Sequence, residues 1–319
     1  MPDLRSIVLS TNMSKRAFRS RQRYRTGLGA TYHGDSAELL TALPDASVQA
    51  IITSPPFALK RKKQYGNPSE AAYLDWFLAF VPEFRRVLKR NGSLVIDIGG
   101  AWMPGSPTRS IYQFELLVSL VREEKFFLAE EFYWYNRAKL PGPAQWVTID
   151  RIRVKDAVNP IWWLSKTTKP KADNRRVLRP YSDAMHKLFR RGYNEGRRPS
   201  GHVVRDKFAR NNGGAIPPNL IEVSNTRSID SYQVFCREHG HAIHPARFPR
   251  EVPEFFVNFL TQPGDLVLDP FAGSNMTGAV AEHLGRRWLA FDKDADYLDG
   301  SVGRFDDEAL TWVCGAVAA

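Results

Sequence analysis

Two short apolar runs in this sequence, residues 50–52 and 266–268, each stop at polar residues followed by proline. The first run continues as Thr-Ser-Pro-Pro-Phe (53–57) and the second as Asp-Pro-Phe-Ala-Gly-Ser (269–274). Apolar runs of this length that end at Pro or Gly are typical of buried strands in a parallel sheet. Such sheets bind ligands beyond the carboxyl ends of their strands, so we expect both corners to lie side by side at one site.

Strand-like and helix-like segments alternate around these runs. The pattern before residue 137 predicts strands at 47–53 and 93–100, a helix over 70–92 kinked near Pro82, a helix over 112–126 and an extended segment over 126–136. From residue 244 it predicts helices over 244–262 and 275–285 and strands at 265–269 and 286–292. This alternation predicts an α/β fold, a doubly wound Rossmann-like sheet with helices on both faces.

Positive charge is concentrated in two parts of the chain. Residues 137–212 hold 19 Lys and Arg against 6 Asp and Glu, and the first 30 residues hold 7 against 1, whereas the remainder is acidic. A single charged cluster is often only a solvated face, but an asymmetry this large favours a polyanion such as nucleic acid. An organelle transit peptide is the alternative interpretation of the amino end, because that segment is rich in Arg and Ser.

These features predict four parts of the chain. They are a basic amino-terminal arm (1–30), a first half of the α/β domain (31–136), a smaller basic inserted lobe that reads the target (137–239), and a second half of the α/β domain (240–319). No apolar run approaches the about 18 residues that a membrane span needs. The two cysteines give no disulfide framework, so the cytoplasm is the expected compartment.

The Asp-led corner favours a nucleoside without phosphates. Gly273 and Ser274 allow close backbone approach at a helix start, and Asp292 ends the next strand at a spacing that suits ribose hydroxyls. The full glycine fingerprint of NAD- and FAD-binding folds is missing, which disfavours a nicotinamide oxidoreductase. An ordinary strand–turn–helix corner is the alternative. Phe271 is expected against an adenine ring.

The Ser-led corner suits an exocyclic amino group. Such an amine is a poor nucleophile, because its lone pair is delocalised into the base. The hydroxyl of Ser54 and a nearby backbone carbonyl can accept its two N–H groups, while Pro55 and Pro56 fix the backbone and add no donors. Phe57 would stack on a base that has been flipped out of the duplex. Asp97, at the end of the neighbouring predicted strand, faces the base or is simply a polar strand end.

The Thr-Ser-Pro-Pro-Phe and Asp-Pro-Phe-Ala-Gly-Ser-Asn motifs together resemble those of the amino-methyltransferases of DNA that use S-adenosylmethionine. Their order, with the catalytic motif first, is that of the permuted β class. The resemblance implies Ser54, Pro55, Pro56 and Phe57 as catalytic residues. It also implies a set of cofactor-binding residues: Asp35, Asp269, Phe271, Gly273, Ser274 and Asp292. The segment 244–249 would line the methionine part of the cofactor. Many relatives have Gly-Thr-Thr after the Gly-Ser pair, whereas this chain has Asn-Met-Thr (275–277), so Asn275 and Thr277 are not counted among the cofactor contacts.

The resemblance implies transfer of a methyl group from S-adenosylmethionine to N4 of a flipped cytosine in double-stranded DNA, without a metal. It further implies a restriction–modification system with a cognate endonuclease. Adenine-N6 methylation is the alternative, because Ser at the first motif position favours cytosine only by tendency. A catalytically silent DNA-binding protein of the same fold is another, and charge alone also allows RNA. Neither cysteine follows a proline, which disfavours methylation of the cytosine ring carbon.

Two other patterns are weaker. Cys236, His239, His241 and His244 suggest zinc, but their spacing matches no common zinc site. Trp146, Trp162 and Trp163 are expected in the core of the inserted lobe rather than as platforms for stacked bases.

Overall fold

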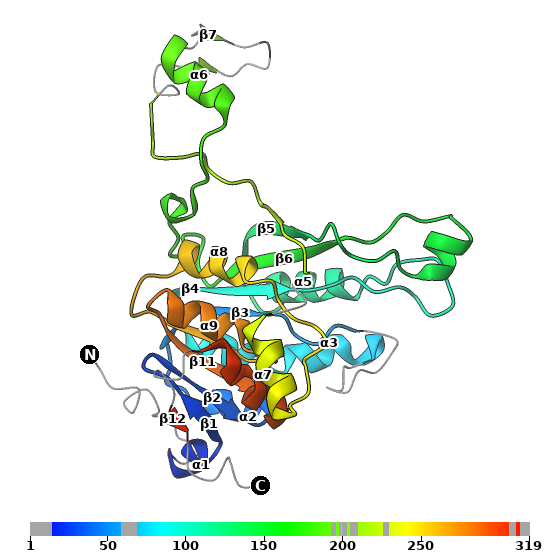
Figure 1. Ribbon diagram of the computed structural model, residues 1–319, viewed down its shortest axis with the longest axis vertical. Helices are drawn as coiled ribbons and strands as arrows, with labels where there is room; N and C mark the ends of the chain where they lie inside the picture. Colours follow the sequence, from blue (N-terminus) through cyan, green and yellow to red (C-terminus); the bar gives the residue numbers. More distant parts are fainter. Residues whose placement is uncertain are drawn as a thin grey trace.

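The computed structural model describes residues 15–58, 69–192, 196–197, 199, 203–204, 210–225, 230–305 and 311–312. Within them, ten strands form one sheet in the order β12-β1-β2-β11-β10-β3-β4-β6-β5-β9 (Figure 1). The strands are β1 (Gln22–Arg25), β2 (Gly29–His33), β3 (Val48–Thr53), β4 (Leu88–Asp97), β5 (Phe127–Tyr135), β6 (Val158–Ser165), β9 (Leu220–Glu222), β10 (Leu266–Asp269), β11 (Arg287–Asp292) and β12 (Thr311–Trp312). A separate two-stranded sheet pairs β7 (Gly196–Arg197) with β8 (Val203–Val204).

The described residues also form α-helices, most of which cover the two faces of the large sheet. They are α1 (Lys15–Ser20), α2 (Ser36–Thr41), α3 (Glu70–Leu78), α4 (Val81–Val87), α5 (Tyr112–Arg122), α6 (Asp183–Arg191), α7 (Ser231–His239), α8 (Glu251–Leu260), α9 (Met276–His283) and α10 (Ala295–Gly300). Side chains of α2, α3, α4 and α5 pack into one core with Ile51 of β3, and those of α8, α9 and α10 pack into a second with Ala50 and Ile52. Neighbouring residues of β3 therefore point into opposite cores, as a strand covered on both faces requires.

The order of the strands creates one crevice at the centre of the sheet. From β3 the chain proceeds outward to β4, whereas from β10 it proceeds in the other direction to β11. The five strands β2, β11, β10, β3 and β4 are parallel neighbours. The order reverses between β3 and β10, the position at which sheets of this kind bind ligands. The predicted doubly wound α/β fold is confirmed.

The structure differs from the sequence-based expectation around Pro82. The segment 70–92 is two helices, because α3 ends at Leu78 and α4 begins at Val81 with Pro82 in its first turn. Proline is favoured there, since the first amide hydrogens of a helix have no partner within it. The strand that follows starts at Leu88 rather than at Ser93, because residues 88–92 extend β4 alongside β3.

Residues 158–165, inside the predicted lobe, belong to the large sheet. They form β6, which pairs antiparallel with both β4 and β5. Trp162 and Trp163 are buried on its two faces and so lie in the main cores, not in the core of a separate lobe. Figure 1 shows α6 and β7 standing away from the sheet. The four-part division of the chain stays a proposal, with the lobe interrupted by β6.

The amino-terminal part is packed in its described residues. Residues 1–14 lie outside the described part of the chain, but Phe18 of α1 and Tyr24 of β1 are fully buried. The ring of Phe18 stacks on Tyr32 at 4.2 Å. The described residues of this part therefore pack against the α/β body.

Candidate active site

The two corners predicted from the sequence lie side by side. Strands β3 and β10 are parallel neighbours, with Ile51 opposite Leu268. At their carboxyl ends Thr53 Oγ1 donates a 2.7 Å hydrogen bond to Asp269 Oδ1. The last residue before Ser54 is thus bonded to the acid that begins the second corner.

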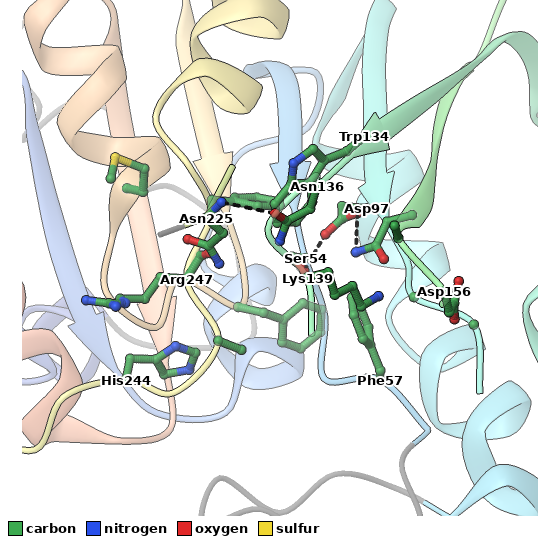
Figure 2. Close-up of a pocket in the computed structure, with 18 of the residues that line it drawn as sticks. Ser54, Phe57, Asp97, Trp134, Asn136, Lys139, Asp156, Asn225, His244 and Arg247 are labelled. Atoms are coloured by element: carbon green, nitrogen blue, oxygen red, sulfur yellow. Dashed lines mark hydrogen bonds between the residues drawn. The ribbon is translucent and has the colours of Figure 1, made fainter. Parts of the chain in front are cut away.

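Both corners line a cavity of about 430 Å³. Its wall includes Ser54 and Phe57 from the first corner, and Asp269, Phe271, Ser274 and Thr277 from the second and its helix. The opposite wall comes from β4, β5 and β6 and the segments beside them, and it includes Asp97, Trp134, Asn136, Lys139 and Asn159. Figure 2 shows Ser54, Asp97, Asn136 and Trp134 gathered on one side, with His244 and Arg247 on the other. The volume is within the range of pockets for small organic ligands.

A second cavity of about 120 Å³ adjoins the first. The two cavities have five wall residues in common: Ser54, Phe57, His244, Ala246 and Phe271. The second cavity adds Pro55, Pro56, Asp292 and a set of side chains that includes Ser36, Trp76, Phe80 and Lys293. Ser54 and Phe271 therefore stand at the junction of two compartments, one lined by Asp97 and the other by Asp292.

Ser54 is oriented by Asp97. The Ser54 hydroxyl donates a 3.0 Å hydrogen bond to Asp97 Oδ2, and the Asn159 amide donates a 3.4 Å bond to the other oxygen of the same carboxyl (Figure 2). With its proton directed at Asp97, the Ser54 oxygen has lone pairs free for a donor in the cavity. Burial raises the pKa of Asp97 to about 7, although the bonds from Ser54 and Asn159 favour the charged form. The pair therefore joins an acceptor to a carboxyl that titrates near neutral pH.

The ring of Phe57 requires a glycine next to it. A β-carbon on Gly99 would lie 2.5 Å from Cε2 of Phe57. Any larger residue at position 99 would thus displace the ring from the cavity wall. This contact explains why β4 is followed by glycine at that point.

The second corner is held by its own acids. Burial raises the pKa of Asp269 to about 6, while hydrogen bonds from the Thr53 hydroxyl and the Phe271 amide oppose the shift. Asp292 Oδ2 accepts a 2.7 Å bond from the Gly273 amide, and burial raises its pKa to about 6 as well. Gly273 has φ +49° and a β-carbon there would lie 2.9 Å from Nε2 of His244, so only glycine fits this turn.

Two other positions that the sequence singled out have structural roles. Asp35 caps α2 through the Ala37 amide at 2.9 Å and forms an ion pair with Lys293 at 2.7 Å, so it lies at the rim and not among the lining residues. Asn275 is buried and caps α9 by accepting from the Gly278 amide at 3.1 Å. The residues 59–68 that carry the basic cluster after Phe57 lie outside the described part of the chain.

The proposed zinc residues do not gather. His241 Nδ1 contacts Asp296 at 2.6 Å, and His239 Nδ1 contacts the backbone oxygen of Phe235 at 3.0 Å. Cys236 lies on the buried face of α7, against Gly300. Across the residues that the structure describes, no group of His, Cys, Asp and Glu side chains has the arrangement of a metal site.

Thr53→Val tests the bond that joins the two corners. Valine keeps the volume but leaves the buried Asp269 carboxyl without one of its donors, so we expect a loss of about 1–3 kcal/mol in the free energy of unfolding. Urea denaturation of the ligand-free protein measures this loss. Thr41→Val removes a solvent-exposed bond to Glu38 and should cost less than about 0.5 kcal/mol. Equal stabilities of the two variants would contradict the structural role of Thr53.

Comparison with known proteins identifies the family. A model of the DNA methylase family matches residues 48–302. The type II methyltransferase M.PvuII of Proteus hauseri is 50% identical over 297 residues, which cover 92% of this chain and 88% of that protein. The chain belongs to the DNA methylase family. The sequence-based resemblance to amino-methyltransferases of DNA is thereby confirmed.

Solved structures agree with the methylase fold. The structure of PvuII DNA methyltransferase (cytosine-N4-specific) superposes with a TM-score of 0.73 at 45% identity, covering 89% of this methylase and 88% of that chain. TTHA0409, a putative DNA modification methylase from Thermus thermophilus solved with S-adenosyl-L-methionine, superposes with a TM-score of 0.54. It is 22% identical and covers 88% of this chain and 95% of that one. At that identity the likeness concerns the fold alone.

The structure adds wall residues of the methylase that the sequence did not indicate. Trp134, Asn136 and Asn159 come from β5 and β6 and the segments beside them, and no local motif marks any of them. Asn159 and Pro160 lie within β6, and an Asn-Pro pair is not by itself the signature of a binding site. Only the antiparallel pairing of β6 with β4, which sets Ile161 opposite Asp97, brings Asn159 near the catalytic corner. Among the described residues, no helix of the methylase has the length and apolar character of a membrane span.

Proposed function

We propose that this methylase transfers a methyl group from S-adenosylmethionine to the exocyclic N4 of a cytosine flipped out of duplex DNA. The observation that carries the proposal is the position of Ser54, bonded to Asp97 and located where the two cavities join. The cytosine-N4 specificity printed for the PvuII structure, at 45% identity, supports the choice of base.

The residues that line the smaller cavity suit an adenosine. Aromatic side chains supply an apolar wall, with Phe271 packed against Trp76 at 5.5 Å and Phe80 at 5.1 Å between ring centroids. Asp292 supplies acceptors for ribose hydroxyls beside the glycine turn. The larger cavity continues along Ser274 and Thr277, where an amino-acid chain can extend from the sugar. Asp269, Phe271, Gly273, Ser274 and Asp292 are thus proposed to hold the cofactor, with Asp35 acting only at the rim.

Ser54 and its neighbours are proposed to prepare the amine. The Ser54 oxygen accepts one N–H of the base, and a backbone oxygen at the Ser54–Pro55 corner accepts the other, so the nitrogen lone pair is released from the ring. Phe57 holds the ring of the base by stacking, while Pro55 and Pro56 keep the corner rigid.

The transfer itself leaves one proton to remove. S-adenosylmethionine supplies an electrophilic methyl carbon, and the bond from N4 to that carbon forms as the bond from carbon to sulfur breaks. The amine then carries one proton too many. Asp97, linked to the amine through the Ser54 hydroxyl, is placed to take this proton as a general base. No covalent enzyme intermediate is needed.

Partners follow from the chemistry proposed. Duplex DNA is the substrate, and a restriction endonuclease acting on the same site is the proposed companion, as the type II designation of the relative indicates. The cytoplasm is the proposed compartment, because the proposed substrate is DNA.

Methylation of plasmid DNA by the purified protein, followed by sequencing that detects modified bases, tests the activity and the base together. We expect N4-methylcytosine in one short sequence context. N6-methyladenine would overturn the choice of base, and unmodified DNA despite measurable DNA binding would indicate a silent DNA-binding protein.

Asp292→Asn tests the cofactor compartment. The amide removes one charged acceptor and directs N–H groups at the Gly273 amide, so we expect the Kd for S-adenosylmethionine to rise about 10- to 100-fold. Isothermal titration calorimetry without DNA measures it. The matched control is Asp296→Asn, whose carboxyl contacts His241 outside both cavities and should leave the Kd unchanged. Unchanged binding by Asp292→Asn would remove Asp292 from the cofactor site.

A further inference from the structure

The chain between β5 and β6 forms an extended arm beside the larger cavity. We call residues 136–157 the β5–β6 arm; Figure 1 shows it reaching beyond the end of the sheet. Its base is closed by a 2.9 Å hydrogen bond from the Asn136 amide to the Ala157 oxygen. Farther out, the ring of Trp146 lies 5.2 Å from that of Trp102, and Arg153 Nε donates to the Pro107 oxygen at 3.0 Å. The arm is therefore held in place by the loop after β4.

Apolar side chains on this arm are unusually exposed. Of the large apolar side chains in the described residues, Val154 (86% exposed) and Leu140 (84% exposed) are the most accessible, and Ile149 and Ile152 on the same arm are also exposed. Single exposed apolar residues are common, but a group of them on one projecting element marks a contact surface. Leu140 differs from the other three because it also lines the mouth of the larger cavity, next to Lys139.

Charge on the arm indicates what it contacts. Arg151, Arg153 and Lys155 alternate with Ile152 and Val154, and all five side chains are exposed. The arm as a whole has five basic and two acidic residues. Cations that alternate with apolar side chains suit a surface that has phosphates at its edge and stacked rings inside, which is the chemistry of a DNA groove.

We propose that Leu140 enters the DNA duplex at the position vacated by the flipped cytosine. This inference rests on the proposed function, because it concerns how the base reaches the cavity. A base that leaves the stack exposes the faces of its two neighbours, and an apolar side chain that fills the gap opposes its return. Leu140 stands at the mouth of the cavity that would receive the base, while the cations of the arm hold the flanking phosphates. It is thus a positioning residue that acts on base extrusion and not on methyl transfer.

Leu140→Ala separates extrusion from transfer. The assay is single-turnover methylation of two duplexes, one with the target cytosine paired to guanine and one with it opposite an abasic site. On the paired duplex we expect the rate to fall at least about tenfold, because the variant lacks the group that fills the gap. Opposite the abasic site the cytosine is already unpaired, so the rate should stay within about twofold of wild type. Leu140→Met, which keeps an apolar side chain of similar size, should restore the rate on the paired duplex.

Val118→Ala is the matched control, because Val118 is an exposed apolar residue on α5, outside the arm and the lining of the larger cavity. It should leave both rates unchanged. An undiminished rate of Leu140→Ala on the paired duplex, or an equal loss on both duplexes, would overturn the proposal. If the wild-type protein methylated neither duplex, the proposed function would fail instead, and the two failures are therefore distinguishable.

Discussion

Ser54→Ala is expected to lower kcat by about 10²- to 10³-fold, because the variant loses an acceptor that prepares the amine for transfer. Binding of S-adenosylmethionine should change by less than about twofold, since the hydroxyl acts on the base and not on the ground-state cofactor complex. Steady-state methylation at saturating DNA and cofactor gives the first quantity, and calorimetry gives the second.

The control for this variant is Ser47→Ala. The Ser47 hydroxyl bonds the Pro44 oxygen at 2.7 Å, outside the lining of both cavities, so its loss should leave kcat unchanged. A Ser54→Ala enzyme that methylates at the wild-type rate would exclude Ser54 from the mechanism. A variant with weakened cofactor binding and intact kcat would move Ser54 from the base to the cofactor side.

Asp97→Asn is expected to lower kcat by about 10²- to 10⁴-fold, the range of a lost general base. An asparagine amide can donate to the Ser54 oxygen, which would then present its proton to the cavity instead of its lone pairs.

The wild-type rate should also rise with pH, because the pKa of Asp97 is about 7 and only its charged form accepts a proton. At pH 6 about one tenth of the molecules would carry the carboxylate. A pH–rate profile from about pH 5.5 to about pH 8.5 measures this rise in rate, which Asp97→Asn should lack.

Protein stability gives an independent check on the same group. Burial raises the pKa of Asp97 from its ordinary value of 3.8, so the folded protein holds this proton more tightly than the unfolded chain does. The stabilisation from the bound proton is complete below 3.8 and is lost as pH rises through about 7. The free energy of unfolding of Asp97→Asn should therefore decline less steeply with pH than that of the wild-type protein between these two pH values. If Asp97→Asn and the wild-type protein lost stability equally over this pH range, Asp97 would not lose its proton within it.

The sequence predicts one half of the site well because that half is local. Each corner is a strand, a turn and a helix start, so Ser54, Phe57, Asp269 and Phe271 could be placed from a few neighbouring residues. Their adjacency followed from a rule about parallel sheets, and the pairing of β3 with β10 agrees with it.

The other half of the site depends on long-range pairing. The segment 137–212 looked unlike a sheet because it is basic and rich in proline, yet β6 within it completes the sheet beside β4. Asn159 and Trp134 reach the cavity only through this hairpin. The predicted end of the helix at residue 92 was wrong for a related reason, because pairing with β3 extends β4 over residues 88–92, which look helical in isolation.

A crystal structure with the demethylated cofactor and duplex DNA containing the target site tests the central claim most directly. We expect N4 of an extruded cytosine about 2.6–3.2 Å from Ser54 Oγ, with the adenosine in the smaller cavity beside Asp292 and the sulfur facing the amine. An adenosine bound outside the smaller cavity, or an extruded base without contact to Ser54, would contradict it.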